Sequence, residues 1–211
     1  MHEYHKIQTV FKRDEKTKKI ILGDYTSSEF KTLENALWDW TEKVDGTNIR
    51  IHWNGEKVIF GGKTDSAQIP VQLLYKLQEL FEGTAKRQLL KDVFKDATNV
   101  TLYGEGYGFK IQKDGKNYLS DSHSFALFDV RIGDWWLQRT DVEDIAKKLG
   151  LEICPVIHQG TLLEAIEAVK IGQQSTWGNF IAEGLVLRPT TELFTRKGER
   201  VITKIKHRDF N

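Results

Sequence analysis

Between residues 48 and 53, apolar side chains fall at every second position and polar side chains fill the positions between them. This alternation is typical of a strand with one buried face, because side chains point to opposite faces along a strand. Asn54-Gly55 follows, a pair that favours a two-residue type I′ turn, and Val58-Ile59-Phe60 can return as the second strand. The pattern predicts an antiparallel hairpin over residues 48–60.

Four later segments carry the signals of helices. Apolar residues recur at every third or fourth position over residues 68–82, and a shorter stripe covers residues 89–94. Two further helices are predicted by capping boxes at Thr140 and Thr161, in each of which a glutamate follows the threonine by three residues. We interpret these stripes as core packing, because an apolar face usually packs against the interior.

The remaining patterns are mostly those of strands. Residues 124–132 form a nearly continuous apolar run, which predicts a strand buried on both faces, and the last two strands are predicted over residues 182–188 and 200–206. Strands and helices follow one another in blocks, with no proline- or serine-rich break. This order favours an α+β domain with mostly antiparallel sheets over a doubly wound parallel sheet.

Composition narrows the class of protein further. The chain has 211 residues, of which 39% are hydrophobic and 29% charged, so it can build a globular core. A net charge of +1 means that any site for a polyanion must be a local patch. The charged run from Lys12 to Lys19 contains acids as well, which favours a solvated turn over a nucleic-acid contact.

The single cysteine and the lack of a long apolar run indicate the cellular compartment in which we expect the protein. The one cysteine, Cys154, cannot form an intrachain disulfide, which suits a reducing compartment. We interpret it as a small buried side chain, with a catalytic thiol as the alternative. The sequence shows no signal peptide and no bilayer-spanning run, so we expect a cytoplasmic protein without a membrane partner.

The first candidate for chemistry is Lys43 in Lys43-Val44-Asp45-Gly46, just before the predicted hairpin. A lysine there is either a surface charge or a nucleophile that bonds covalently to a substrate. Lys-x-Asp-Gly should occur by chance in roughly one chain in twenty of this length. The tetrapeptide therefore decides little unless the later chain supplies the partners that a nucleophilic lysine needs.

Later residues can supply such partners. Glu105 lies between two glycines that leave room for a ligand, although it could equally be a turn residue. Asp129 and Glu183 each interrupt an apolar run, and a buried carboxylate is costly unless it is paired. Lys204 and Lys206 share one face of a strand, where they either protect an exposed edge or clamp a phosphate.

These residue types are what covalent nucleotidyl transfer requires. A lysine must be neutral to attack phosphorus, and deprotonating it at neutral pH costs roughly 4 kcal/mol from a reference pKa of about 10.4. Neighbouring cations or a bound metal reduce that cost. Cations also neutralise the charge that develops on the phosphoryl group, while carboxylates hold a metal and the ribose and an aromatic ring stacks on the base.

The ordered set resembles the covalent nucleotidyltransferase superfamily of RNA ligases, DNA ligases and mRNA capping enzymes, over nearly the whole chain. The residues around the first and last motifs are most similar to ATP-dependent RNA ligases of the nick-sealing type. The resemblance implies a nucleotidyltransferase (adenylation) domain with two mostly antiparallel sheets flanked by helices. The matching motifs are Lys43–Gly46, Tyr103-Gly104-Glu105, Phe125–Asp129, Glu183–Arg188 and Lys204-Ile205-Lys206.

The resemblance also implies roles in an ATP-dependent ligation. Lys43 attacks the α-phosphate of ATP, releases pyrophosphate and becomes lysyl-AMP. Glu183 orients the lysine and binds Mg²⁺ or Mn²⁺ mainly through water, while Lys204 and Lys206 grip the α-phosphate. The AMP then passes to an RNA 5′-phosphate and a 3′-hydroxyl displaces it, so that RNA ends, in a nicked duplex, are the expected partner in RNA repair.

Other positions complete the expected ATP site. The resemblance implies that Glu42 borders the adenine, Phe128 stacks on it and Glu105 holds the ribose. Arg50 is a predicted contact for the triphosphate or the 5′-phosphate. The list of cofactor-binding residues is completed by Lys63, where the family usually has an arginine with its fork of donors, and by Arg188. In an ideal strand Glu183 and Arg188 face opposite sides, and a bulge at Gly184 would reconcile them.

Relatives that seal strands usually continue into a second domain. We therefore expect residues 1–211 to be a single adenylyltransferase domain without a C-terminal OB-type or other nucleic-acid-binding domain. The alternatives are a DNA ligase, a capping-type nucleotidyltransferase, or a module that binds nucleotide or nucleic acid without efficient turnover. The sequence does not predict the oligomeric state.

Overall fold

The computed structural model describes all residues from Met1 to Asn211. The chain divides into two compact units, each built from separate stretches of sequence. Unit 1 comprises residues 1–5 and 45–154, and unit 2 comprises residues 6–44 and 155–211. Each unit has its own sheet and its own hydrophobic core.

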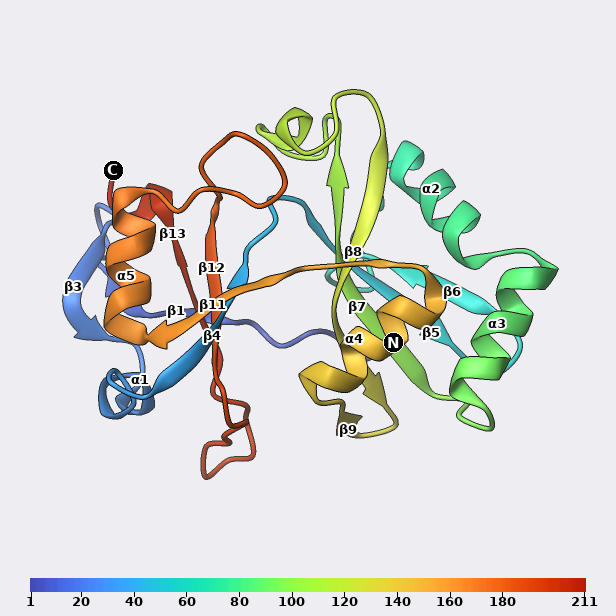
Figure 1. Ribbon diagram of the computed structural model, residues 1–211, viewed down its shortest axis with the longest axis horizontal. Coiled ribbons are helices and arrows are strands. Elements are labelled where there is room, and N and C mark those ends of the chain that lie inside the picture. The colour runs from blue at the N-terminus through green and yellow to red at the C-terminus, as the bar shows by residue number, and fades with distance from the viewer. The chain divides into compact units, whose positions relative to one another are not determined.

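Unit 2 contains a five-stranded sheet with the order β1-β13-β12-β4-β11 (Figure 1). All neighbouring pairs are antiparallel except β1 with β13. Unit 2 also contains a two-stranded ribbon, formed by β2 and β3, and two helices, α1 and α5. The bounds are β1 Gln8–Thr9, β2 Phe11–Arg13, β3 Ile20–Tyr25, α1 Ser28–Thr32, β4 Leu37–Glu42, β11 Val156–Thr161, α5 Leu162–Ile171, β12 Gly184–Pro189, β13 Thr203–Lys206 and the 3-10 turn η2 His207–Asp209.

Helix α5 covers one face of the unit 2 sheet, as Figure 1 shows. Its apolar side chains pack against inward residues of three neighbouring strands. The predicted capping box at its start is confirmed, because Thr161 accepts a hydrogen bond from the backbone of Glu164 and the Glu164 carboxylate accepts one from the backbone of Thr161. The core formed there includes Trp38, Trp40, Leu185, Leu187 and Ile205 from the strands and Leu162, Ala165, Ile166 and Val169 from α5.

Unit 1 contains a six-stranded sheet with the order β10-β8-β7-β5-β6, and β9 pairs with β8 outside this path. The predicted hairpin is confirmed as β5 paired with β6, but the predicted two-residue type I′ turn at Asn54-Gly55 is wrong. Trp53 pairs with Val58, so residues 54–57 join the strands, and of the predicted pair only Gly55 has a positive φ, +94°. The Asn54 side chain instead accepts hydrogen bonds from the backbone of Glu56 and Lys57. The bounds are β5 Thr47–Trp53, β6 Val58–Gly61, β7 Val100–Gly108, β8 His123–Ile132, β9 Trp135–Trp136 and β10 Glu152–Ile153, with the 3-10 turn η1 at Gly115–Asn117.

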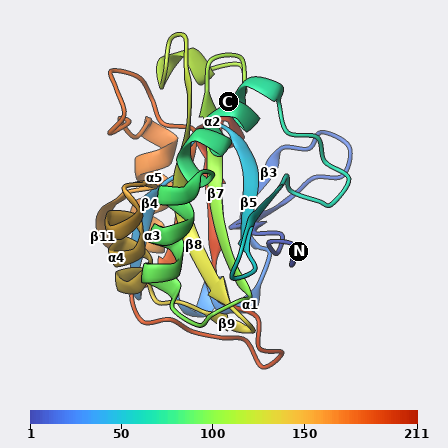
Figure 2. The same ribbon diagram turned by 90° about the vertical axis from the view of Figure 1, so that its right-hand side faces the viewer.

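Three helices pack on one face of the unit 1 sheet: α2 Val71–Phe81, α3 Thr84–Phe94 and α4 Arg139–Leu149. Figure 2 views the sheet from the side of α2 and α3. Helix α4 begins one residue before Thr140, so the predicted cap there is wrong. Its Glu143 carboxylate instead accepts a hydrogen bond from Arg139 at 2.7 Å, which takes the group that the capping box would use.

The other face of this sheet is covered by the first residues of the chain. The hydroxyl of Tyr4 donates to the buried carboxylate of Asp129 at 2.8 Å, and the hydroxyl of Tyr103 donates to the carbonyl of His2 at 3.0 Å. The rings of Tyr4 and Trp136 pack edge to face at 5.5 Å. Asp129 is therefore paired, as its buried position requires.

The predicted fold class is confirmed as α+β with mostly antiparallel sheets. The predicted strands over residues 182–188 and 200–206 exist but begin later, at Gly184 and Thr203. No helix in the structure combines the length and the apolar character needed to cross a bilayer.

Candidate active site

Lys204 and Lys206 share one face of β13, as predicted. Ile205 between them is 1% exposed and belongs to the core under α5, so the two lysines point away from that core. Residue pairing across the sheet places Val186 of β12 beside Lys204, and Arg188 shares the face of Val186. Arg188 therefore lies on the same face as the two lysines.

Lys43 and Lys206 meet on the carboxylate of Glu183. The Nζ of Lys43 donates to Oε2 of Glu183 at 2.6 Å, and the Nζ of Lys206 donates to Oε1 at 2.5 Å. The three side chains are 18%, 16% and 10% exposed, so they are largely withdrawn from solvent but still reachable. Two cations thus share one anion, although 140 residues separate Glu183 from Lys43.

The backbone explains how Glu183 reaches this face. Strand β12 begins only at Gly184, so strand alternation does not govern the Glu183 side chain, and the β12 ladders run from there without a register shift. The predicted bulge is therefore not the device that aligns Glu183 with Arg188. A Cβ on Gly184 would lie 2.0 Å from the carbonyl oxygen of Ile205, so only glycine permits this close approach.

Electrostatics keep Glu183 ionised. Burial alone would raise the pKa of its carboxyl group, but the charge of Lys43 and the hydrogen bonds from Lys206 and Lys43 outweigh burial and lower the pKa below its usual value. At neutral pH the carboxylate is therefore an anion that orients two ammonium groups. Such a cluster can receive a phosphate, because an incoming anion can take the place of the shared carboxylate.

The side chains of the site determine what kind of divalent-metal site it can form. No three side chains among histidine, cysteine, aspartate and glutamate come together as a metal cage. Mg²⁺ commonly binds through one or two carboxylates, with substrate phosphates and water completing its shell. Glu183 alone fits that kind of site, in which the nucleotide brings most of the ligands.

Glu42 lies on the opposite side of the strand from Lys43. It pairs with Leu185 in the ladder, is 1% exposed, and accepts hydrogen bonds from Ser175 and Thr176. The predicted proximity of Glu42 to an adenine stays a prediction. Ser175 and Thr176 were not predicted, because no pattern in the sequence pairs them with a residue more than 130 positions away.

Two predicted residues of unit 1 lie on its sheet. Glu105 is half-buried in β7, and Gly46 approaches so closely that a Cβ there would lie 2.8 Å from the Cγ of Glu105. The β7–β8 ladder shifts register between Tyr103 and Gly104, which leaves Phe128 as the extra residue of a bulge. Its ring is partly exposed and packs edge to face on Tyr4 at 5.1 Å. The expected roles of Glu105 and Phe128 stay predictions.

Arg50 and Lys63, both predicted to contact phosphate, lie in different environments. The guanidinium of Arg50 is fully buried and donates to the carbonyls of Gly62 and Met1 and to Asp65. A phosphate could bind Arg50 only by displacing these bonds, so the geometry favours a structural role. Lys63 is exposed, as a contact to a polyanion requires.

A structural ion pair near the end of the chain was also missed. Asp209 accepts hydrogen bonds from the backbone of Lys206 at 3.2 Å and from Arg13 at 2.7 Å. Its carboxylate therefore fixes the end of β13, just where Lys206 leaves the strand. Arg13 belongs to β2, at the edge of the charged run predicted to be a solvated turn.

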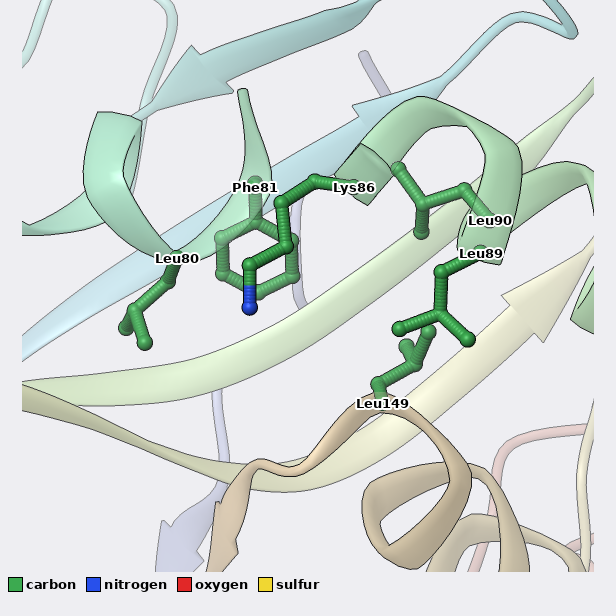
Figure 3. A pocket seen from close by; sticks show the side chains of 6 residues that line it. All are labelled: Leu80, Phe81, Lys86, Leu89, Leu90 and Leu149. Atoms are coloured by element: carbon green, nitrogen blue, oxygen red, sulfur yellow. The ribbon is translucent and has the colours of Figure 1, made fainter. Parts of the chain in front are cut away.

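The pocket in Figure 3 lies in unit 1 and has a different character. It is lined by apolar side chains of α2 and α3 and the end of α4, with the stem of Lys86 beside them. Most of these side chains belong to the core or pack on it, so the pocket is a gap at the edge of the core. Its lining residues are Leu80, Phe81, Lys86, Leu89, Leu90 and Leu149.

Comparison with solved structures places the fold. The Naegleria gruberi RNA ligase K170A mutant with ATP and Mn matches with a TM-score of 0.65 and 15% identity, over 95% of this chain and 61% of that chain. The same ligase with PPi matches with a TM-score of 0.63 and 16% identity, over 96% and 61%. The K326A mutant with ATP and Mn gives 0.64 and 16%, over 86% and 54%. This chain thus shares the fold of that RNA ligase.

The family follows from the sequence itself. The model of the RNA ligase family matches residues 37–206, and the chain belongs to that family. A search of curated protein sequences finds no significant relative. The chain spans between half and two thirds of the length of the solved ligase chains named above.

Proposed function

We propose that this chain is the adenylyltransferase domain of an ATP-dependent RNA ligase. In this proposal Lys43 becomes lysyl-AMP, the AMP passes to the 5′-phosphate of RNA, and a 3′-hydroxyl displaces it to join the strand. The observation that carries the proposal is the pair of ammonium groups of Lys43 and Lys206 on the single carboxylate of Glu183.

The first step follows from this arrangement. The ammonium of Lys43 first gives a proton to water, and the neutral Nζ then forms a bond to the α-phosphorus while the bond from that phosphorus to pyrophosphate breaks. The nitrogen releases a second proton to water and keeps one in the lysyl-AMP. The ammonium of Lys206 lies beside the nucleophile and stabilises the negative charge on the phosphoryl oxygens. The lowered pKa of Glu183 makes this carboxylate an orienting group and a weak proton acceptor.

ATP and a divalent metal are supported as cosubstrate and cofactor. The similar Naegleria gruberi ligase has been solved with ATP and Mn, with AMP and Mn, and with PPi. A bound Mg²⁺ or Mn²⁺ would withdraw charge from the phosphates during transfer. Among the residues present, Glu183 would hold it, mainly through water.

RNA ends are the proposed partner, in keeping with the family. Lys204 and Arg188 share the face of Lys206 and add two positive charges to it. In unit 1, Glu105 is proposed to hold the ribose, Phe128 to stack on the adenine, and exposed Lys63 to contact a phosphate. A nicked duplex is the proposed substrate, and RNA repair the proposed setting.

Intact-mass spectrometry after incubation with ATP and Mg²⁺ tests the first step. We expect wild type to gain the mass of one AMP and Lys43→Ala to gain none. Lys170→Ala is the matched control, because Lys170 is a lysine of the same unit that pairs with Glu167 on an exposed helix surface. It should be labelled like wild type. An adduct that survives Lys43→Ala would refute Lys43 as the nucleophile.

A further inference from the structure

Glu42 is a buried carboxylate at the end of β4, directly before Lys43. It is 1% exposed and lies on the side of the sheet that packs under α5, next in alternation to Trp40. A charge in such a place is costly unless strong hydrogen bonds compensate it. The partners of Glu42 therefore show what this carboxylate does.

Those partners come from one dipeptide in the segment between α5 and β12. The hydroxyl of Ser175 donates to Oε1 of Glu42 at 2.5 Å. Thr176 donates twice to Oε2, from its backbone N–H at 2.8 Å and from its hydroxyl at 2.7 Å. Hydrogen bonds to an ionised acceptor are the stronger kind, so the dipeptide is firmly tied to β4.

The segment that carries the dipeptide is itself cross-linked. Ala182 donates through its N–H to the carbonyl of Gln173 at 2.9 Å, and the N–H of Ser175 donates to the carbonyl of Phe180, also at 2.9 Å. A β-bridge between Gln174 and Ile181 lies between these two bonds. Fixing the dipeptide therefore also fixes Ala182, the residue before Glu183.

Backbone pairing also joins the end of β4 to the start of β12, next to the two catalytic side chains. The N–H of Lys43 donates to the carbonyl of Gly184 at 3.0 Å, and Glu42 pairs with Leu185 in the β4–β12 ladder. Lys43 directly follows Glu42, which the Ser175-Thr176 dipeptide holds. Glu183 directly follows the cross-linked segment of residues 173–182. The Lys43–Glu183 ion pair thus sits between two stretches of backbone that the Glu42 carboxylate joins.

We propose that Ser175 and Thr176 are positioning residues for the transfer of AMP to Lys43. Through Glu42 they hold the end of β4 and the approach to Glu183 in one register, so that the amine and its orienting carboxylate meet. The inference rests on the proposed function, and it makes Glu42 an anchor and not a contact with adenine. A displacement of about 1 Å at such a pair can slow a reaction a hundredfold.

Single-turnover formation of lysyl-AMP tests this role. Thr176→Val removes one hydroxyl but keeps the branched shape and the backbone N–H, and Thr176→Ser keeps the hydroxyl. Thr161→Val is the matched control, because it removes a threonine–glutamate bond at the other end of α5. We expect Thr176→Val and Ser175→Ala to slow the reaction at saturating ATP about tenfold. Thr176→Ser and Thr161→Val should stay within about twofold of wild type.

A second readout separates anchoring from base recognition. For the slow variants we expect the half-saturating ATP concentration to stay within about twofold of wild type, and the preference for ATP over GTP to be unchanged. A wild-type rate in Thr176→Val would overturn the proposal. So would a changed nucleotide preference, because the Glu42 cluster would then be reading the base.

Hydrogen exchange keeps this test independent of the proposed function. A wild type that forms no adduct would refute the proposed function and leave the anchor to be judged by structure alone. The amides of residues 173–182 should then exchange faster in Thr176→Val than in Thr161→Val, because the segment has lost a tie to β4. Equal exchange in the two variants would refute the anchor.

Discussion

Two sets of cations in this protein, Arg50 in unit 1 and the pair of Lys43 and Lys206 in unit 2, are held in different ways. In unit 1, Arg50 is fully buried and directs its donors at the carbonyls of Gly62 and Met1 and at Asp65. In unit 2, Lys43 and Lys206 are slightly exposed and share the carboxylate of Glu183. Both groups were predicted from the sequence to contact phosphate.

The difference shows which cations are available for chemistry. Carbonyl groups of the backbone cannot move away from Arg50 without disturbing the fold, so this cation is a structural part of unit 1. A carboxylate shared by two lysines can be replaced by a phosphate, which brings more negative charge and more acceptors. The arrangement of partners, more than burial, separates the two roles.

The largest expected effect is on catalysis in unit 2. Lys206→Ala should slow lysyl-AMP formation by about 10²–10³, the usual loss when one charge-stabilising donor is removed. Single-turnover kinetics with ATP and Mg²⁺ would measure it, with Lys170→Ala as the control. A rate within a few fold of wild type would mean that Lys206 does not face the reacting phosphate.

The next effect is on stability in unit 1. Arg50→Met should lower the free energy of unfolding by about 2–3 kcal/mol, because it leaves buried carbonyl groups without a charged donor. Urea unfolding would measure the loss. The adenylylation rate of the folded variant should stay close to that of wild type. A stable Arg50→Met with a collapsed rate would instead support the phosphate contact predicted from the sequence.

A smaller effect should follow pH. The pKa of Glu183 is lowered in the folded state, so its ion pairs contribute stability above the pKa of an unfolded glutamate, about 4.3. That contribution is lost as the pH falls through the lower, folded pKa. The stability advantage of wild type over Glu183→Gln should therefore be present at pH 7 and shrink at pH 3, as measured by urea unfolding. An advantage that grows on acidification would contradict the ionised carboxylate.

Much of the fold could be predicted because it depends on local pattern. The hairpin of β5 and β6, the apolar faces of α2 and α3 and the capping box of α5 all follow from residues close in sequence. The cap at Thr140 failed because Arg139 takes the carboxylate of Glu143. A local sequence pattern thus predicts where a helix cap can form, but neighbouring side chains that compete for the same hydrogen bonds decide whether it does.

The candidate site was predictable in its residue types but not in its pairings. A period of two places Lys204 and Lys206 on one face, but only the fold brings Lys43 to Glu183. Arg50 falls on the polar face of its strand, and the sequence gives no sign that residues 1–5 cover that face. Long-range partners of this kind come from tertiary structure, which one sequence does not show.

The most direct test of the central claim is to locate the AMP after incubation with ATP and Mg²⁺. Peptide mapping by tandem mass spectrometry would assign the modified residue in wild type. We expect AMP on the peptide that contains Lys43, bonded to the side-chain nitrogen of Lys43, and on no other lysine. AMP on Lys204 or Lys206, or no AMP on any residue, would contradict the central claim.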